Sequence, residues 1–307
     1  MSDYDLSIRD LALALLICVV WAGNFTAAAQ GMQHFSPFLF MILRFLLVLA
    51  ILLPFVRLPP PGQWGVLIMV CLCIGGLHFT LMFWALSRSD DVSSVAIIQQ
   101  MFIPIAVILA IPLIGERVGW ITLTAVMVSF LGVLIVGLDP MVLGQIDVLA
   151  ITLVSALFQA LGSIYQRRIT GMTVMNFQAW TAIISLPILI TATLLFEQGQ
   201  AEILRTARWE HWAAVCYSAV LASIVGHGLF FFLVQRHPVS IVMPYLQLTP
   251  VLAVVIGILI WGDRPGWRLL VGGVLVIASI LLITLRARAR IGKAEIAALG
   301  RLRRRSE

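Results

Sequence analysis

Charged residues are scarce in this sequence of 307 residues. Only 11% of the residues are charged, whereas 61% are hydrophobic and the mean hydropathy is +1.06. Soluble globular domains carry roughly 25% charged residues. The low charge therefore excludes an ordinary soluble domain and indicates a protein of the lipid bilayer.

Acidic residues are missing from the middle of every long apolar stretch. All fourteen fall in predicted loops, tails or helix ends. A transporter that exchanges protons for lipophilic cations needs a buried carboxylate that either species can neutralise, so this placement argues against cationic-drug antiport. The sequence also lacks an intramembrane metal cluster and a phosphate-binding glycine loop. We therefore expect no enzymatic activity, no metal and no other cofactor.

Cysteine is also rare. The four cysteines all lie in apolar runs, and they are Cys18, Cys71, Cys73 and Cys216. Cys71 and Cys73 are two residues apart and would point to different sides of a helix. We interpret all four as packing residues rather than as a disulfide or a metal site.

What the sequence does contain is ten apolar stretches of about 20 residues, the length that crosses a bilayer as a helix. Proline and glycine separate several of them, as in Pro59-Pro60-Pro61-Gly62. We predict an all-α polytopic membrane protein with ten transmembrane helices, and a surface loop at 197–210. The predicted spans are 11–31, 37–56, 64–87, 92–113, 118–138, 147–166, 175–196, 211–234, 238–260 and 266–285.

Basic residues are distributed unevenly between the two sides of this topology. Fourteen Lys and Arg residues share the side of the N-terminus, and five lie on the other side. Because cytoplasmic loops carry the excess of basic residues, both termini are predicted to be cytoplasmic. The basic tail at 286–307 could bind nucleic acid or anionic lipid, but fixing the orientation explains it without a partner.

A short pattern occurs twice in the sequence. The stretch IGERVGW at 114–120 matches WGDRPGW at 261–267, which lies 147 residues further on. The same offset pairs two further polar residues, Ser93 with Ser240 and Gln100 with Gln247. An internal repeat of this kind indicates duplication.

Five helices in each half would make the second half enter the membrane from the opposite side. We therefore predict two inverted five-helix repeats, at 10–138 and 147–285, around a central cavity. The two heptapeptides would then be equivalent turns on opposite sides of the membrane.

Three short segments resemble a known family. Trp21-Ala22-Gly23-Asn24-Phe25, Leu43-Arg44-Phe45 and the Gly115-Glu116 turn are similar to the EamA-type repeat of the drug/metabolite transporter superfamily, and the whole is nearest to the YddG-like aromatic amino-acid exporters. The resemblance implies an exporter of the bacterial inner membrane. The second half departs from the pattern, with Phe158-Gln159-Ala160 in place of a Trp-led motif and Asp263 in place of Glu.

Polar residues recur on one side of several predicted helices. Since polar groups that face lipid are costly, such stripes should line the interior, although small polar residues also serve as packing contacts between helices. The sixth helix carries Thr152, Ser155, Gln159, Ser163 and Gln166 on one side. Shorter stripes are Gly75, His78 and Met82; Ser93, Ala96 and Gln100; and Ser240, Met243 and Gln247.

Three membrane residues can ionise. His78 and His227 lie in corresponding helices, and each is either a packing residue or a substrate contact. Arg44 is the only basic residue deep within a span. It either donates to backbone or Asn24 oxygens as a structural link or attracts the carboxylate of a substrate.

Three prolines lie within predicted spans, where they remove helical hydrogen bonds and favour bending. We predict Pro104, Pro244 and Pro250 to be hinges.

Together these features predict export of neutral amino acids, aromatic and aliphatic, or similar metabolites by alternating access. The alternatives are export of other metabolites or drugs, a channel-like pore, and a receptor or scaffold. The expected partners are a small-molecule substrate and the lipid bilayer, without nucleic acid, and the protein is expected to be a monomer. The predicted substrate-binding residues are Trp21, Asn24, Arg44, His78, Phe79, Met82, Gln100, Gln159, Ser163, Trp180, His227, Tyr245 and Gln247.

Overall fold

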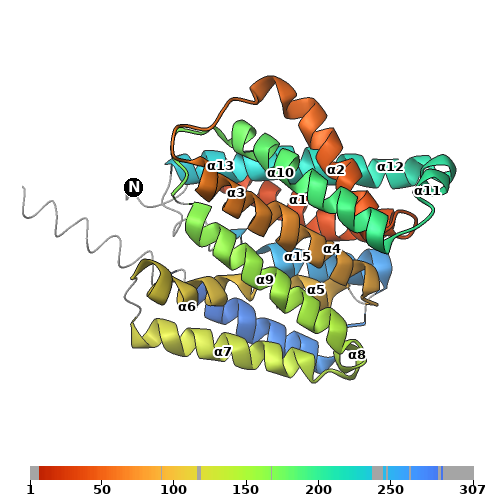
Figure 1. The fold of residues 1–307 in the computed structure, drawn as a ribbon. Coiled ribbons are helices and arrows are strands. Elements are labelled where there is room, and N and C mark those ends of the chain that lie inside the picture. Colours follow the sequence, from red (N-terminus) through yellow and green to blue (C-terminus); the bar gives the residue numbers. More distant parts are fainter. Residues whose placement is uncertain are drawn as a thin grey trace, which may run out of the picture.

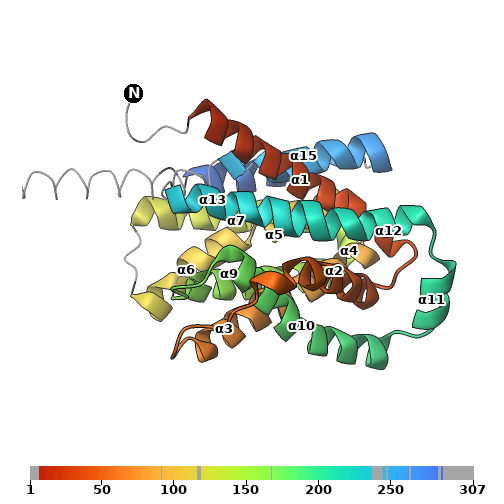
Figure 2. The same cartoon turned by 90° about the horizontal axis from the view of Figure 1, so that it is seen from above.

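The computed structural model is a bundle of helices that run side by side along one direction (Figures 1 and 2). It describes residues 7–90, 92–115, 119–166, 168–236, 245–246, 248–262, 264–282 and 285, and these residues include no β-strand. The prediction of an all-helical protein is confirmed for this part of the chain.

The first half contains four long helical segments, some of them interrupted, followed by a fifth helix. Their elements are α1 (Ile8–Met32), α2 (Pro37–Leu52) with the short turn η1 (Leu53–Phe55), α3 (Trp64–Cys71) with η2 (Leu72–His78) and α4 (Phe79–Arg88), and α5 (Val92–Gln99) with α6 (Phe102–Ile114). Helix α7 (Trp120–Gly137) closes this half. The segment η2 is π-helical, so the third helical segment, made of α3, η2 and α4, contains an inserted turn.

The second half follows the same plan after the short helix α8 (Pro140–Leu143). Its elements are α9 (Ile146–Gln166), α10 (Val174–Phe196), α11 (Gln200–Thr206), α12 (Trp209–Cys216) with η3 (Tyr217–Gly226) and α13 (His227–Arg236), and α15 (Leu248–Ile256) with η4 (Gly257–Trp261). A last helix covers Trp267–Leu282. Both η3 and η4 are π-helical.

Seven helices within the described residues are long and apolar enough to cross a membrane. Three shorter apolar helices, Trp120–Val136, Leu248–Ile260 and Trp267–Leu282, fall within the other three predicted spans. The count of ten spans therefore stays a prediction. One prediction was wrong, because the expected surface loop at 197–210 contains helix α11 and the start of α12.

The ends of α2 and α10 are joined by one carboxylate. Pro37 occupies the first turn of α2, and the backbone N–H groups of Phe38 and Leu39 donate to the two Glu197 oxygens at 2.8 and 3.1 Å. Free N–H groups at a helix N-terminus are stabilised by an anionic acceptor. Glu197, at the end of the adjacent helix α10, thereby caps a helix of the other half.

The two halves interpenetrate instead of forming separate domains. Helix α1 packs against α15, η3 and α12 of the second half, and α9 packs against α6, α4 and η2 of the first. Each half therefore places its first helix among helices of the other. The centre of the bundle is built from both halves.

The two repeated turns lie at opposite ends of the bundle. Helix α6 ends, and α7 begins, at the end of the bundle where α1 begins, whereas Gly266 in the other turn lies against the Asp139 carboxylate beside α8, at the far end (Figure 1). The predicted inverted arrangement of the halves is compatible with this placement.

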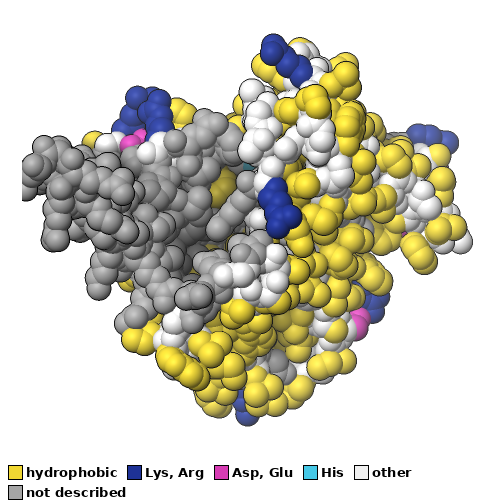
Figure 3. Space-filling view, turned by 60° about the vertical axis from the view of Figure 1, so that its left-hand side comes forward, with side chains coloured by type: hydrophobic (Ala, Val, Ile, Leu, Met, Phe, Trp, Pro, Cys, Tyr) yellow, Lys and Arg dark blue, Asp and Glu magenta, His cyan; other side chains and the backbone are white. Residues whose placement is uncertain are grey.

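Apolar side chains cover much of the side of the bundle (Figure 3). Exposed examples are Val19, Leu46, Met127, Leu194 and Val274. A surface of this kind suits contact with lipid. Figure 3 looks toward the end where α1 begins, and the surface there is hollowed.

Candidate functional site: a buried polar cluster between the halves

Polar side chains gather in the interior where helices of the two halves meet. Arg44, His78, Gln99 and Ser155 are 1%, 2%, 4% and 0% exposed. They come from α2, η2, α5 and α9. Because buried polar groups are costly unless they are paired, their hydrogen bonds decide what this region can do.

Ser155 is the centre of a chain of hydrogen bonds. Its hydroxyl lies 2.8 Å from Nδ1 of His78, 2.9 Å from the carbonyl oxygen of His78 and 3.2 Å from Oε1 of Gln99. The Ser155 hydroxyl donates its one proton to a carbonyl oxygen, and it then accepts from His78 in the tautomer that carries a proton on Nδ1. Gln99 Nε2 then donates to Oε1 of Gln159 at 2.8 Å, which extends the chain along α9.

Among the described residues, Arg44 forms no ion pair with an acidic side chain. Its Nε donates to Oγ of Ser223 at 3.0 Å, and its guanidinium carbon lies 4.7 Å from the ring centre of Phe79 and 5.3 Å from that of Phe83. Nη1 of Arg44 is fully buried without an acceptor among the described residues. The cation is thus held by neutral groups and aromatic faces.

Aromatic rings connect this cation to the first helix. The Phe79 ring lies 4.7 Å from the His78 ring and 6.3 Å from the His227 ring, measured between centroids. The His227 ring is in turn 5.0 Å from the indole of Trp21. A continuous group of rings therefore runs beside Arg44 from η2 to α1.

The π-helical segment η3 positions several of these groups. Ser223 donates to the carbonyl oxygen of Ser218 at 3.0 Å, and both Trp21 Nε1 and His227 Nδ1 bond the carbonyl oxygen of Ala222, at 3.3 and 2.9 Å. A π turn disturbs the regular helical ladder, and here side chains bond its carbonyl oxygens.

Glycine is required where Trp21 meets η3. A Cβ atom added to Gly226 would lie 2.5 Å from Trp21 Nε1 and 2.9 Å from Trp21 Cδ1. These separations are too short for any side chain, so Gly226 permits the indole to reach the Ala222 carbonyl.

Most of the predicted site residues lie in or beside this cluster. The structure brings together Trp21, Arg44, His78, Phe79, Gln159 and His227 by hydrogen bonds or ring contacts. Asn24 is buried on α1, one turn from Trp21, and its Oδ1 has no partner in the described part. Ser163 is half-buried on α9, one turn beyond Gln159.

Other predicted site residues lie elsewhere. Trp180 donates to the Arg57 carbonyl oxygen at 2.8 Å and packs edge-on against Trp64, so it belongs to an end of the bundle. Met82 packs in an apolar core, and Tyr245 packs against the start of α1. Gln100 lies in the break after α5, and the neighbouring Gln99 makes the hydrogen bonds to the cluster. Gln247 lies outside the described residues.

Two of the three predicted hinge prolines lie in the described residues. Pro104 is the third residue of α6, after the break at Gln100 and Met101, and the Gln100 carbonyl oxygen accepts from Ile103 N at 3.2 Å. Pro104 has no N–H to offer that oxygen, which explains the break. Pro250 is the third residue of α15. Pro244 lies outside the described residues, and the hinge role remains a prediction.

Three residues of the cluster were not predicted, namely Gln99, Ser223 and Phe83. The signal for Gln99 was present, because Gln99 and Gln100 follow Ala96 by three and four residues, and both spacings fall on the same side of a helix. Ser223 and Phe83 belong to the cluster because they contact Arg44, and the spacing of residues in the sequence does not indicate these contacts.

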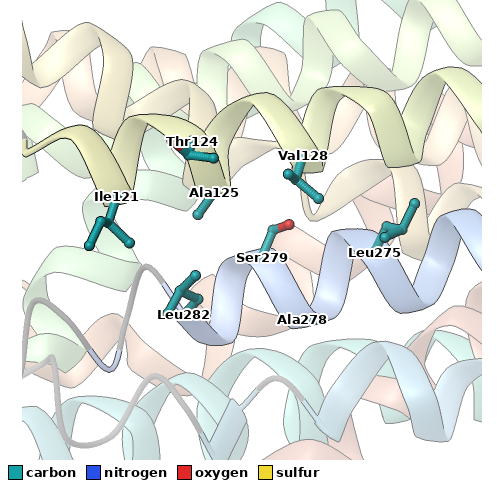
Figure 4. Close-up of a pocket in the computed structure, with 8 residues that line it drawn as sticks. All are labelled: Ile121, Thr124, Ala125, Val128, Leu275, Ala278, Ser279 and Leu282. Atoms are coloured by element: carbon teal, nitrogen blue, oxygen red, sulfur yellow. The ribbon is translucent and has the colours of Figure 1, made fainter.

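A separate groove of about 300 Å³ runs along the outside of the bundle, between α7 and the last helix. It is lined by Ile121, Thr124, Ala125, Val128, Leu275, Ala278, Ser279 and Leu282 (Figure 4). Its lining is mostly apolar and none of the cluster residues contributes to it. We assign it no part in the polar site.

Comparison with known proteins identifies the family. The sequence matches the EamA-like transporter family twice, over residues 9–138 and 147–285. The chain belongs to the EamA-like transporter family. A family of transporters agrees with the apolar helices described above, and the chain is a multi-pass membrane protein.

Two curated relatives carry the same name. The chain is 26% identical to a "Probable amino-acid metabolite efflux pump" of Escherichia coli (strain K12), over 90% of this chain and 94% of the relative. It is also 26% identical to a protein of the same name from Salmonella typhimurium (strain LT2), over 93% and 98% of the two chains.

One solved structure has the same fold. It is 16% identical, has a TM-score of 0.62, and the match covers 92% of this chain and 98% of that chain. At this identity the likeness concerns the fold alone.

Proposed function

We propose that this EamA-family transporter exports neutral amino acids, aromatic and aliphatic, from the cytoplasm by alternating access. The observation that carries the proposal is the composition of the central cluster. It offers one cation, two histidines and several amide and hydroxyl groups, and none of its described members is acidic. A zwitterion can be held by such groups without a fixed negative charge that would select cations.

The neutral groups can serve both ends of an amino acid. Amide N–H groups and the Arg44 guanidinium donate to a carboxylate, while amide oxygens such as the unpartnered Asn24 Oδ1 accept from an ammonium. The rings of Trp21, Phe79 and His227 offer an apolar surface to the substrate side chain. The printed name of the two curated relatives supports the same substrate class.

Alternating access would require the bundle to open at each end in turn. The break before Pro104 and the position of Pro250 are where we propose that the fourth and ninth spans bend. We propose an inner-membrane location with both termini cytoplasmic, which the distribution of basic residues supports.

The test is transport into liposomes that contain the purified protein. We expect saturable flux of phenylalanine and leucine, and flux of tetraphenylphosphonium, an organic cation, no greater than in liposomes without protein. Flux of the cation together with no flux of any neutral amino acid would show that the proposed substrate class is wrong. Linear flux without saturation would favour a channel-like pore over alternating access.

A further inference from the structure

We propose that Arg44 is the carboxylate anchor of the transport site, and that the protein therefore also accepts monocarboxylic acids that lack an amine. This inference rests on the proposed function and narrows its substrate class. The substrate carboxylate is then the obligatory group, whereas the ammonium is dispensable.

The first argument is the state of the Arg44 guanidinium. Arginine stays protonated in proteins, and a buried cation without a counter-charge is expensive. Arg44 is 1% exposed, and its Nη1 lacks an acceptor in the described part of the chain. The sequence places no acidic residue in the middle of any span that could supply the missing charge. A substrate carboxylate would provide both the acceptor and the charge.

The second argument is the way in which the neighbours hold Arg44. Its hydrogen-bond partner, Ser223, is a neutral hydroxyl, and the guanidinium carbon lies over the faces of the adjacent Phe79 and Phe83 rings. Ser223 accepts from one of the five guanidinium N–H groups, and Nη1 has no acceptor among the described residues, so part of the planar edge is left for hydrogen bonding. The edge is the part that binds a carboxylate with two parallel hydrogen bonds.

The third argument is the asymmetry between the two ends of an amino acid. The carboxylate would meet a full positive charge, whereas the described cluster offers the ammonium only neutral acceptors such as Asn24 Oδ1. Both contacts are charge-assisted hydrogen bonds, but only the contact between Arg44 and the carboxylate joins two opposite charges and adds their Coulomb attraction. Removing the carboxylate should therefore cost far more binding than removing the ammonium.

The rings beside Arg44 suggest the matched set of probes. Phenylalanine has both groups, 3-phenyllactate has the carboxylate without the amine, and 2-phenylethylamine has the amine without the carboxylate. In proteoliposomes we expect saturable flux of phenylalanine and of phenyllactate, with apparent affinities within about tenfold of each other, since the α-hydroxyl of phenyllactate can still donate to the neutral acceptor that meets the ammonium. Phenylethylamine should not exceed the passive flux of liposomes without protein.

Variants of Arg44 provide the second measurement. Arg44→Lys keeps the charge but loses the planar edge, whereas Arg44→Gln loses both. The measured quantity is the apparent affinity for phenyllactate, taken from the thermal stabilisation of the purified protein. We expect this affinity to fall about tenfold in Arg44→Lys and to be lost in Arg44→Gln. Arg208→Gln changes an exposed arginine and is the matched control. If Arg44→Gln fails to fold, the lysine variant still tests the proposal.

The outcomes separate this inference from the proposed function. Flux of phenylalanine with equal flux of phenylethylamine and none of phenyllactate would overturn the anchor and leave amino-acid export standing. Flux of phenyllactate without phenylalanine would support the anchor and overturn amino-acid export. Unchanged stabilisation by phenyllactate in a folded Arg44→Gln variant would also overturn the anchor.

Discussion

Gly115 and Gly262, which lie 147 residues apart, have the same left-handed backbone conformation, with φ 68° and ψ 25° in one and φ 70° and ψ 25° in the other. Each follows the helix that precedes a heptapeptide turn, and glycine adopts this conformation without a steric penalty. The repeat is therefore present in local geometry as well as in sequence. The shared geometry occurs at opposite ends of the bundle.

This relationship predicts opposite sidedness for the two turns. In a variant without the four native cysteines, a single cysteine at Val118 should react with an impermeant thiol reagent only from the cytoplasmic side. A single cysteine at Pro265 should react only from the outside. Labelling of both positions from one side would contradict the inverted arrangement.

The contact between Gly226 and Trp21 predicts a large effect of one methyl group. Gly226→Ala would place a Cβ atom 2.5 Å from Trp21 Nε1 and displace the indole from the Ala222 carbonyl. We expect a loss of about 1 to 3 kcal/mol in the free energy of unfolding, as for other overpacked interiors, and strongly reduced transport. Thermal unfolding in detergent and proteoliposome flux measure these two effects.

The matched control is Gly228→Ala, two residues further on. There the nearest atom to an added Cβ is Met175 Cε at 3.9 Å, so alanine should be neutral or stabilise the helix by up to about 1 kcal/mol. Equal behaviour of the two variants would mean that the close approach of Trp21 has no consequence.

The hydrogen bonds of Ser155 predict that its hydroxyl is essential for binding. Ser155→Ala would leave the buried His78 Nδ1–H without its acceptor and would cut the link from His78 to Gln99. An unpaired buried donor costs about 1 to 3 kcal/mol. We expect the apparent affinity for phenylalanine to fall roughly tenfold or more, as measured by initial rates of flux.

Ser87→Ala removes a hydroxyl of the same kind at an exposed position, where it donates to the Trp84 carbonyl oxygen. Its transport should match that of the unchanged protein. A Ser155→Ala variant with unchanged affinity would place the hydrogen-bonded chain outside the transport site.

The helical fold was predictable because bilayer thickness fixes the length of apolar runs, and these runs are long and well separated. The polar cluster was predictable only in part. Ser155 and Gln159 follow the period of an uninterrupted helix, and α9 is uninterrupted. The fourth span was read as one continuous helix, but it breaks at Gln100, and every residue of α5 is buried, so periodicity alone does not select Gln99 over Gln100.

The partners of Arg44 could not have been predicted from spacing. Ser223 is 179 residues away in the sequence, and it lies in a π-helical segment whose hydrogen bonds differ from those assumed by helical periodicity. The unpaired Nη1 of Arg44 is likewise a property of the packed bundle. A sequence indicates a costly buried charge, but only the three-dimensional arrangement indicates which neighbours leave it unneutralised.

Two of the three described π-helical segments, η2 and η3, occupy matching places in the two halves, because the repeat offset of 147 maps Leu72–His78 onto 219–225, within Tyr217–Gly226. A π turn contains one residue more than an α turn. If such a turn tightened into α-helix, the helix beyond it would rotate by about 100°, the angle between successive residues. Rotation in one half would redirect Phe79 and in the other His227, the two rings that flank the interior at 6.3 Å. The inserted turns η2 and η3 thus give the bundle two positions at which a helix can rotate about its own axis, one in each inverted half.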